Sequence, residues 1–148
     1  MKIRKMVIED YDEVYNLWLN IKGFAIRSVD DSLEGITRFI NRNPNTSIVA
    51  MEDDKIVGTI LCGHDGRRGC FYHVCVHEDY RKRGIATEMV EIARKALIEE
   101  GISKISLIAF TKNEIGNAFW RNLDWVKVDY VNYYEHILNK ENIIREIE

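Results

Sequence analysis

The sequence predicts a mixed α/β domain of the α+β kind, with a sheet that begins as an antiparallel meander, ends in a parallel strand pair and is flanked by about four helices. Segments with helical apolar spacing surround a central block of segments rich in β-branched residues, and these two patterns predict the architecture. The length of 148 residues fits one domain, residues 1–148, with a substantial core. A composition of 46% hydrophobic and 30% charged residues predicts an ordered globular chain.

A short strand and a helix open the chain. Alternating residues over Lys2–Val7 predict the strand. Apolar residues at helical spacing follow over Glu9–Ile21, and Gly23 stands where a glycine ends a helix. Asp10 with Glu13 three residues later predicts a capping box at the start of this helix.

A second helix is predicted after Asp31, which with Glu34 forms another cap signal. It ends at Asn43-Pro44-Asn45, because proline has no N–H to continue the helical ladder. The segment Gly23–Asp30 between the two helices is predicted to be a loop.

The centre of the chain predicts an antiparallel meander. Its strands are rich in β-branched residues, and they are Ser47–Met51, Ile56–Gly63 and Cys70–Val76. The polar segments Glu52–Lys55 and His64–Gly69 connect them, and the second contains an Asp-Gly pair that tolerates the positive φ of a tight turn.

An amphipathic helix over Thr87–Glu100, a strand over Lys104–Phe110 and a short helix over Asn113–Leu123 follow. A strand, a helix and a strand in this order require a crossover connection, so the sheet becomes parallel here. Trp125–Ile137 is predicted to hold one or two final strands, and residues 138–148 form a charged tail that could contain a helical turn.

Charge and cysteine content restrict the partners and the compartment. The net charge is −3, so no general positive field draws the chain to nucleic acid or to an anionic membrane. The three cysteines, Cys62, Cys70 and Cys75, form no C-x-x-C pair, and the N-terminus lacks the apolar run of a signal peptide. We therefore expect a cytoplasmic, reduced protein with no nucleic-acid or membrane partner.

The segment Tyr80–Thr87 joins the third central strand to the amphipathic helix and has the features of a phosphate site. Backbone N–H groups at a helix N-terminus have no carbonyl partner inside the helix, and the helix dipole adds positive charge there. Gly84 lets a ligand approach the backbone, while Arg81, Lys82 and Arg83 supply local charge. A solvated basic turn is the alternative interpretation.

This segment resembles a family signature. Arg81-Lys82-Arg83-Gly84-Ile85-Ala86 matches the R/Q-x-x-G-x-G/A motif of the GNAT superfamily of acyl-CoA-dependent N-acyltransferases, placed between a strand and a long helix as in that family. The order of elements is similar from the opening strand onward. The run from Asn113 through Trp120-Arg121-Asn122-Leu123-Asp124-Trp125 resembles the family ending of Asn, six residues, Tyr, then Leu-Gly-Phe.

The resemblance implies acetyl-CoA as the acetyl donor and assigns residues to it. The pantetheine arm would bind the main chain of Val74, Cys75 and Val76. The pyrophosphate would be held by the amides of Arg81, Lys82, Arg83, Gly84, Ile85, Ala86 and Thr87. Asn113 matches an asparagine that contacts the pantetheine arm, and as a helix N-cap it has a second, compatible interpretation.

The family reaction defines the chemistry that the site must perform. A neutral amine attacks the thioester, a strand amide near Cys75 or Val76 stabilises the oxyanion, and a proton helps the thiolate leave. Trp120 stands where the family carries its acidic tyrosine, and an indole is no practical acid. Core packing is the other interpretation of Trp120, and Tyr72, Tyr133 or Tyr134 could replace the acid if the fold brings one near the sulfur.

His73, on the strand beside the acetyl site, is the candidate base because of its intrinsic pKa, with a structural histidine as the alternative. His73 and His77 would share a strand face, but no third ligand accompanies them, so no metal site is predicted. Cys70 and Cys75 are interpreted as core residues without a paired base, so no covalent mechanism is expected.

Two functions from different classes follow. The first is an acetyl-CoA-dependent N-acetyltransferase that acts on a small-molecule amine or a basic peptide, with the segment Gly23–Asp30 beside the acceptor. The second, motivated by Trp120, is an acyl-CoA-binding sensor or regulatory module without catalysis. A homodimer is the default expectation for a domain of this type.

Overall fold

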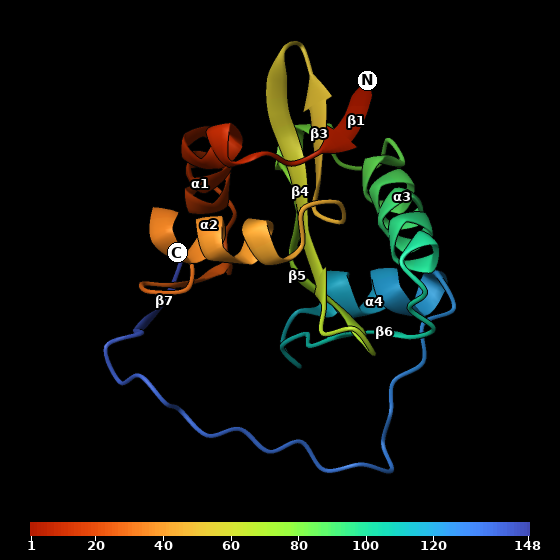
Figure 1. The fold of residues 1–148 in the computed structure, drawn as a ribbon. Helices are drawn as coiled ribbons and strands as arrows, with labels where there is room; N and C mark the ends of the chain where they lie inside the picture. The colour runs from red at the N-terminus through yellow and green to blue at the C-terminus, as the bar shows by residue number, and fades with distance from the viewer.

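A five-stranded mixed sheet runs through the computed structural model, which describes residues 1–148. Its order is β1-β3-β4-β5-β6, and all neighbours are antiparallel except β5 and β6, which are parallel (Figure 1). The predicted meander with a parallel pair at its end is confirmed. The strands are β1 Lys2–Lys5, β3 Ile48–Glu52, β4 Lys55–His64, β5 Gly69–Val76 and β6 Ile105–Leu107.

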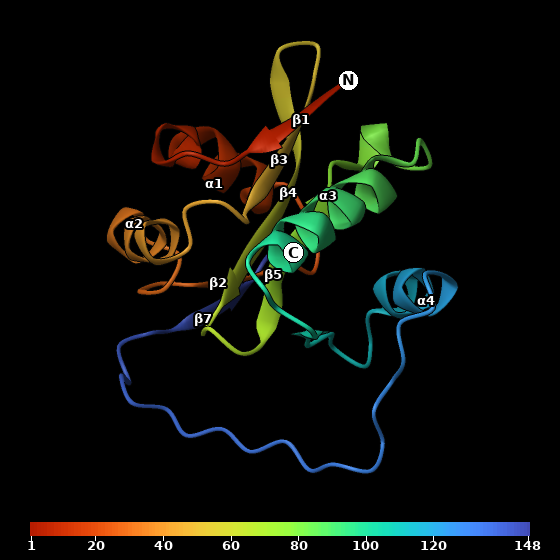
Figure 2. The same cartoon turned by 45° about the vertical axis from the view of Figure 1, so that its right-hand side comes forward.

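Four α-helices cover the two faces of this sheet. One face carries α1 Tyr11–Leu19 and α2 Leu33–Arg42, and the other carries α3 Ile85–Glu99 and α4 Glu114–Asn122 (Figure 2). Two short 3-10 turns, η1 Ile8–Asp10 and η2 Glu78–Tyr80, precede α1 and α3. None of the helices is long and apolar enough to cross a membrane.

The core has two halves, one on each face of the sheet. Val49 packs on the α1 and α2 side, whereas its neighbours Ile48 and Ala50 pack on the α3 side. This alternation is the period of two that a strand imposes. Each half contains a large side chain that is fully buried, Trp18 on the first face and Met89 on the second.

A second, two-stranded sheet corrects two predictions. Ala25–Arg27 forms β2, within the segment predicted to be a loop, and it pairs antiparallel with β7, Ile144–Glu146, within the tail predicted to hold a helical turn. The Ile147 N–H donates to the Phe24 carbonyl at 2.8 Å, and the Ile147 carbonyl accepts the Gly23 N–H at 2.7 Å. These bonds and burial of the Ile147 side chain fix the C-terminus to the body. The pairing joins segments that are far apart in sequence, so no local pattern shows it.

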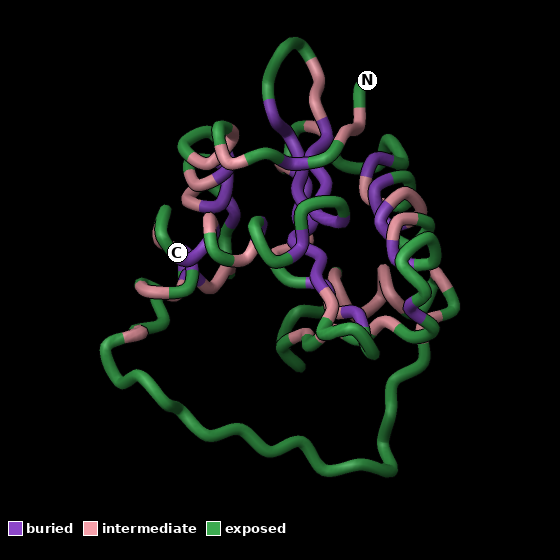
Figure 3. Tube along the Cα trace, in the orientation of Figure 1, coloured by how far each residue is buried: buried purple, intermediate pink, exposed green.

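The strands predicted over Trp125–Ile137 are wrong. Trp125 packs against Trp120, and from Val126 onward the chain runs as an extended, exposed segment away from the body, where no strand pairs with it (Figure 3). Strand β6 also ends at Leu107 instead of Phe110.

Both predicted caps are corrected. Asp10 does not cap α1: its carboxylate binds the Arg4 guanidinium at 2.8 Å and accepts the Val7 N–H at 2.9 Å. Ser32, and not Asp31, caps α2, where its hydroxyl accepts the Gly35 N–H at 3.1 Å. Because Ser32 caps α2, the Asp31 carboxylate is available for hydrogen bonds elsewhere.

Candidate active site

Strand β5 carries a bulge at the candidate catalytic residues. The register against β4 shifts so that His73 and Val74 together stand opposite the single residue Ile60. His73 has a φ of 49°, in the left-handed region that histidine adopts more often than most residues. Such a bulge interrupts the alternation of side chains along the strand.

Because of the bulge, Tyr72 and His73 point to the same face of the sheet, although they are neighbours. The Tyr72 ring meets Phe39 of α2 edge to face at 5.8 Å between ring centroids, and the His73 ring lies 4.6 Å from Trp18 of α1. The structure therefore brings together two of the three residues predicted to be catalytic.

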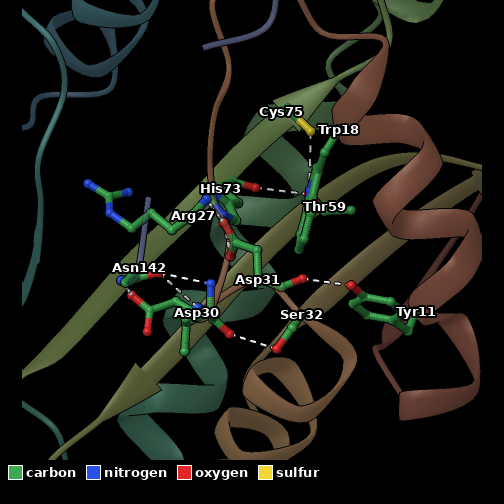
Figure 4. A network of polar contacts seen from close by, with 11 residues as sticks. Tyr11, Trp18, Arg27, Asp30, Asp31, Ser32, Thr59, His73, Cys75 and Asn142 are labelled. Atoms are coloured by element: carbon green, nitrogen blue, oxygen red, sulfur yellow. Dashed lines mark hydrogen bonds and ion pairs between the residues drawn. The ribbon is translucent and has the colours of Figure 1, made fainter. Parts of the chain in front are cut away.

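The imidazole of His73 is held on three sides. Its Nε2 lies 2.8 Å from Oδ1 of Asp31 (Figure 4). Its ring packs between Trp18 and Phe24, with ring centroids 4.6 and 4.7 Å away. When the carboxylate is ionised, Nε2–H donates to it and the lone pair of the imidazole lies on Nδ1. This fixes the ring orientation and leaves Nδ1 as the basic atom.

Asp31 is itself held firmly and its side chain is 5% exposed. Its second carboxylate oxygen accepts the Arg27 N–H at 2.7 Å, and its main-chain carbonyl accepts the Tyr11 hydroxyl at 2.7 Å. A buried carboxylate requires such partners. The sequence analysis missed this role because Asp31 fits a helix cap, and nothing local connects it with a histidine 42 residues away.

The loop that carries Asp31 is clamped by the C-terminal segment. The Asn142 carboxamide oxygen accepts the N–H groups of Val29 (3.0 Å) and Asp30 (3.2 Å), and its amide donates to the Asp30 carboxylate at 2.8 Å. Ser28 adds a hydroxyl bond to the Glu141 carbonyl at 2.9 Å. The orientation of His73 thus depends on residues from both ends of the chain (Figure 4).

A chain of hydrogen bonds between buried polar groups connects the main chain of His73 with Thr59, Trp18 and Cys75. The Thr59 hydroxyl donates to the His73 carbonyl at 2.9 Å and accepts the Trp18 indole N–H at 3.1 Å. Since its single proton is used, the Cys75 thiol, 3.4 Å away, is the donor toward it. Burial raises the pKa of Cys75 to about 11, so its thiol stays protonated near neutral pH.

Strands β5 and β6 diverge soon after they meet. Their pairing covers only Gly69–Phe71 on β5. His77 donates its N–H to the Val57 carbonyl of β4 (2.8 Å), so by alternation the main-chain groups of Val76 point away from β4, toward the open side. Arg81 closes part of this edge with an Nε bond to the Val76 carbonyl at 3.0 Å.

The open strand edge leads to the N-terminus of α3, whose amides are unpaired. No N–H from Lys82 to Thr87 has an acceptor in the chain, and the first helical bond is that of Glu88 to the Gly84 carbonyl at 3.1 Å. Gly84 has a φ of 79°, and a Cβ placed there would meet nothing within 4 Å. Ile85 is buried and anchors this end of α3 in the core. A row of free donors faces open space, as an anion site requires.

The basic side chains of this loop differ in their contacts. Arg83 donates to the Asp79 carbonyl at 3.2 Å and lies over the Tyr80 ring at 5.0 Å. Lys82 is exposed and has a φ of 63°. Arg81 is tied to the strand edge and Arg83 to the turn before the loop, whereas the Lys82 side chain has no partner in the chain and is free to turn toward a ligand.

The remaining predicted residues lie apart from His73. The Asn113 side chain caps α4 by accepting the Gly116 N–H at 3.0 Å. The Trp120 indole packs in an aromatic cluster, 4.7 Å from the Trp125 ring. Tyr134 is 86% exposed on the extended segment, and the structure does not bring its hydroxyl to the candidate site.

Comparison with known proteins places this geometry in a family. A sequence model of the acetyltransferase (GNAT) family matches residues 8–125. Acetyltransferase SG1711 from Sodalis glossinidius (strain morsitans) is 34% identical over 131 residues, which are 88% of this chain and 91% of that protein. The chain belongs to the acetyltransferase (GNAT) family. Membership in the GNAT family confirms the predicted resemblance and supports acetyl transfer as the general activity.

Solved structures of GNAT proteins share the fold. Ard1 from Thermoplasma volcanium is similar with a TM-score of 0.73 at 17% identity, over 86% of this chain and 84% of that chain. The PaiA N-acetyltransferase from Thermoplasma acidophilum, solved in complex with coenzyme A, has a TM-score of 0.72 at 18% identity, over 97% and 95%. At these identities the likeness establishes the fold alone.

Proposed function

We propose that the chain transfers an acetyl group from acetyl-CoA to a primary amine by direct attack in a ternary complex. The observation that carries the proposal is the row of unpaired amides from Lys82 to Thr87, reached from the open edge of β5. A pyrophosphate fits such a row because it accepts hydrogen bonds and is favoured by the helix dipole. The coenzyme A in the similar PaiA structure supports the same donor.

The cofactor follows the strand edge in this proposal. The segment Val74–Val76 takes the pantetheine arm through the Val76 main-chain groups that face away from β4. The unpaired amides of Lys82–Thr87 take the pyrophosphate, beside Arg81, whose own N–H is bonded to the Glu78 carbonyl at 3.4 Å. Asn113 and Trp120, from the start and the middle of α4, complete the cofactor contacts. Their capping and packing roles are compatible with this, because a main-chain or ring surface can serve both.

His73 takes the proton of the amine. Nδ1 carries the free lone pair, and the Asp31 carboxylate stabilises the imidazolium that forms (2.8 Å from Nε2). The amine nitrogen forms a bond to the acetyl carbon, and the oxyanion is stabilised by the strand amide near Cys75 or Val76, of which the Val76 N–H faces the open side. The C–S bond then breaks to release the thiolate.

The thiolate leaves without a strong acid in this mechanism. Trp120 has no acidic proton, and burial raises the pKa of Tyr72 to about 12, so its phenol stays protonated but donates weakly. Tyr134 could act only if its segment moves. Thiols are acidic enough to leave as anions near neutral pH.

The acceptor enters on the α1 and α2 side. A hollow of about 260 Å³ adjoins Tyr72 there, a volume that suits a small amine. Arg42, Arg68 and Asp65 line it, so the hollow offers a carboxylate to a cationic amine and two guanidinium groups to an anionic group on the same acceptor. A panel of amino acids, polyamines and basic peptides, followed by thiol release, identifies the class, and binding without any turnover would favour a sensor instead.

The test is acetyl-CoA binding by calorimetry to the G84E variant. A glutamate at this position places a carboxylate among the amides, and we expect the affinity to fall at least ~100-fold by charge repulsion and steric exclusion. G101E is the matched control, because Gly101 has a φ of 80° at the opposite end of α3 and equally open surroundings. Equal affinity of G84E and the wild type would refute the cofactor site.

A further inference from the structure

The hollow beside Tyr72 carries more polar groups than a simple amine would use. Its lining includes Arg42 at the end of α2, Asn43 just after it, and Asp65 and Arg68 in the turn between β4 and β5. Neither guanidinium group has a carboxylate within 4 Å, so both positive charges are available to a ligand. Two unpaired guanidinium groups in one small hollow favour a carboxylate or another planar anion.

Asn43 adds a hydrogen-bond donor that is fixed in place. The residue is 5% exposed, and its Oδ1 accepts the His64 N–H at 2.8 Å, so Nδ2 lies on the other side of the carboxamide. Nδ2 donates to no group of the chain. Because every fully buried polar side-chain atom has a partner, Nδ2 must open onto the hollow that Asn43 lines. Gly63 leaves room for it, since a Cβ there would lie 2.7 Å from Nδ2. Such a donor favours an acceptor atom from a ligand.

Asp65 brings a negative charge to the same hollow. Its Oδ1 accepts the N–H groups of Arg68 and Arg67, both at 2.8 Å, and these bonds lower the pKa of the carboxyl group. Oδ2 has no partner in the chain. His64 offers nothing further, because Nδ1 accepts a main-chain N–H at 3.0 Å and Nε2 lies 2.7 Å from Glu100. The free groups match the α-carboxylate and the α-ammonium group of an amino acid.

The distance from this hollow to His73 sets the length of the ligand. Cys70 lines the hollow, and His73 follows it by three residues of β5, or roughly 8–10 Å of strand with a bulge. An extended chain of six C–C and C–N bonds of ~1.5 Å each spans roughly 7–8 Å. The rings of Phe39 and Tyr72, 5.8 Å apart between centroids, lie beside this path and offer an apolar surface to methylene groups.

On the basis of the acetyl transfer proposed above, we propose that the acceptor is a free α-amino acid whose side chain ends in a primary amine. The α-carboxylate binds Arg42, Arg68 and the Asn43 amide. The α-ammonium group binds Asp65, and the ω-amine reaches His73. There the neutral ω-amine forms a bond to the acetyl carbon and gives its proton to Nδ1, while the C–S bond breaks to release the thiolate.

Four amines that differ only in the head group test the proposal. Thiol release at saturating acetyl-CoA gives kcat/KM for L-lysine, Nα-acetyl-lysine, lysine amide and cadaverine, and NMR identifies the acetylated nitrogen. We expect lysine to be acetylated on its ω-amine, and lysine amide and cadaverine to have at least ~100-fold lower kcat/KM, because the guanidinium groups and the buried amide are left unpaired. We expect about a 10-fold loss for Nα-acetyl-lysine, which lacks the charge that faces Asp65.

Three results in this series would overturn the proposal. Lysine amide or cadaverine used as well as lysine would show that the head group is not recognised. Acetylation of the α-amine would show that lysine binds in the opposite direction. Equal use of Nα-acetyl-lysine and lysine would assign the site to the C-terminal lysine of a peptide in place of a free amino acid.

Two variants test the residues of the hollow. N43D keeps an oxygen for the His64 N–H but replaces the free donor with a negative charge, so KM should rise at least ~10-fold for lysine and should not rise for cadaverine. R42Q should raise KM for lysine by ~10-fold or more at unchanged kcat, because the head group is bound equally in the ground state and the transition state.

R38Q is the matched control for R42Q. Arg38 lies one turn earlier on α2, is exposed and pairs with Glu34 at 3.3 Å. A lysine KM in R42Q equal to that of R38Q would contradict the assignment. A KM that rises equally for lysine and cadaverine in both N43D and R42Q would mean that these residues support the fold and do not select the acceptor.

Calorimetry of lysine in the presence of coenzyme A separates this proposal from the proposed acetyl transfer. Lysine that binds the wild type, binds R42Q at least ~10-fold more weakly and is never acetylated would refute acetyl transfer and leave the head-group site in place. Acetyl transfer to other amines, with no binding of lysine, would refute the head-group site and leave acetyl transfer in place.

Discussion

At the scale of residues, the histidine and its carboxylate are the centre of the candidate site. His73 alone could be a structural histidine, but its left-handed backbone, its buried Asp31 partner at 2.8 Å and its aromatic walls fix one ring orientation. Strained backbone held by its surroundings is frequent at functional sites. We therefore expect Asp31 to act through His73 as a positioning residue.

A double-mutant cycle tests this expectation. H73Q should lower kcat by about 100-fold or more through loss of the base, and D31N by about 10-fold or more through loss of its orientation. In the H73Q background, D31N should have little further effect, because two residues that act as a unit are not additive. Steady-state kinetics with calorimetric acetyl-CoA affinity as a check for folding measures both.

The outcomes separate the two roles. D12N, on the exposed side of α1, is the control for removal of a carboxylate and should keep the wild-type kcat. Wild-type turnover by H73Q would exclude His73 as the base. An undiminished effect of D31N in the H73Q background would show that Asp31 acts on the fold and not through the histidine.

The buried thiol of Cys75 predicts a loss of stability in alkali. Its pKa is about 11 in the folded chain against an ordinary value of 9.0, because burial disfavours the thiolate. Above pH 9 the unfolded state loses this proton and the folded state keeps it, so the free energy of unfolding falls as pH rises from 9 to 11.

Urea unfolding at pH 8 and pH 10 measures this fall. In C75S the fall should be smaller than in the wild type by on the order of 1 kcal/mol, because serine has no proton to lose in this range. The comparison uses the difference between the two pH values, so any constant cost of the substitution cancels. Equal falls in both proteins would show that Cys75 does not contribute.

At the scale of elements, local periodicity predicts most of the architecture. Apolar spacing correctly places all four α-helices and the strands β3, β4 and β5. It does so because the repeat of a helix or a strand determines which positions of its own sequence face the core. Cap residues are less decisive, because Asp10 and Asp31 both fit a cap signal and both bind elsewhere.

Elements that depend on partners far away in the sequence cannot be predicted from local periodicity. The short strand β2 exists only because β7 pairs with it, more than 100 residues later. The bulge at His73 follows from the register of β5 against β4, and no residue type in β5 predicts that register. Residues 126–138 show the reverse case, because their sequence favours a strand and no segment of the chain pairs with them.

At the scale of the whole molecule, the candidate site has two parts of different predictability. The proposed cofactor loop could be located from the sequence because it lies within one segment, Tyr80–Thr87, with a glycine and three basic residues. The histidine site draws on α1, the loop before α2, β5 and the C-terminal segment, which come together only in the fold (Figure 4). The two parts lie on different elements, so each should respond to its own variants.

The N142A variant tests the most distant of these connections. Asn142 binds two amides and a carboxylate of the loop that carries Asp31, at 2.8 to 3.2 Å, so its loss should loosen that loop and misplace His73. We expect kcat to fall about 10-fold, because small misplacements of catalytic groups are costly. Acetyl-CoA affinity should stay within about 2-fold, because the row of amides at α3 lies on another element.

N139A is the matched control for this substitution. The Asn139 side chain accepts only the N–H of Glu141, at 3.0 Å, and does not reach the loop before α2. Parallel measurements of kcat and calorimetric affinity on both variants decide the point. If N142A keeps the kcat of N139A, or if its affinity for acetyl-CoA falls as far as its kcat, Asn142 does not position the histidine, and the loop before α2 holds its place through its other contacts, such as the Ser28 hydroxyl bond to the Glu141 carbonyl.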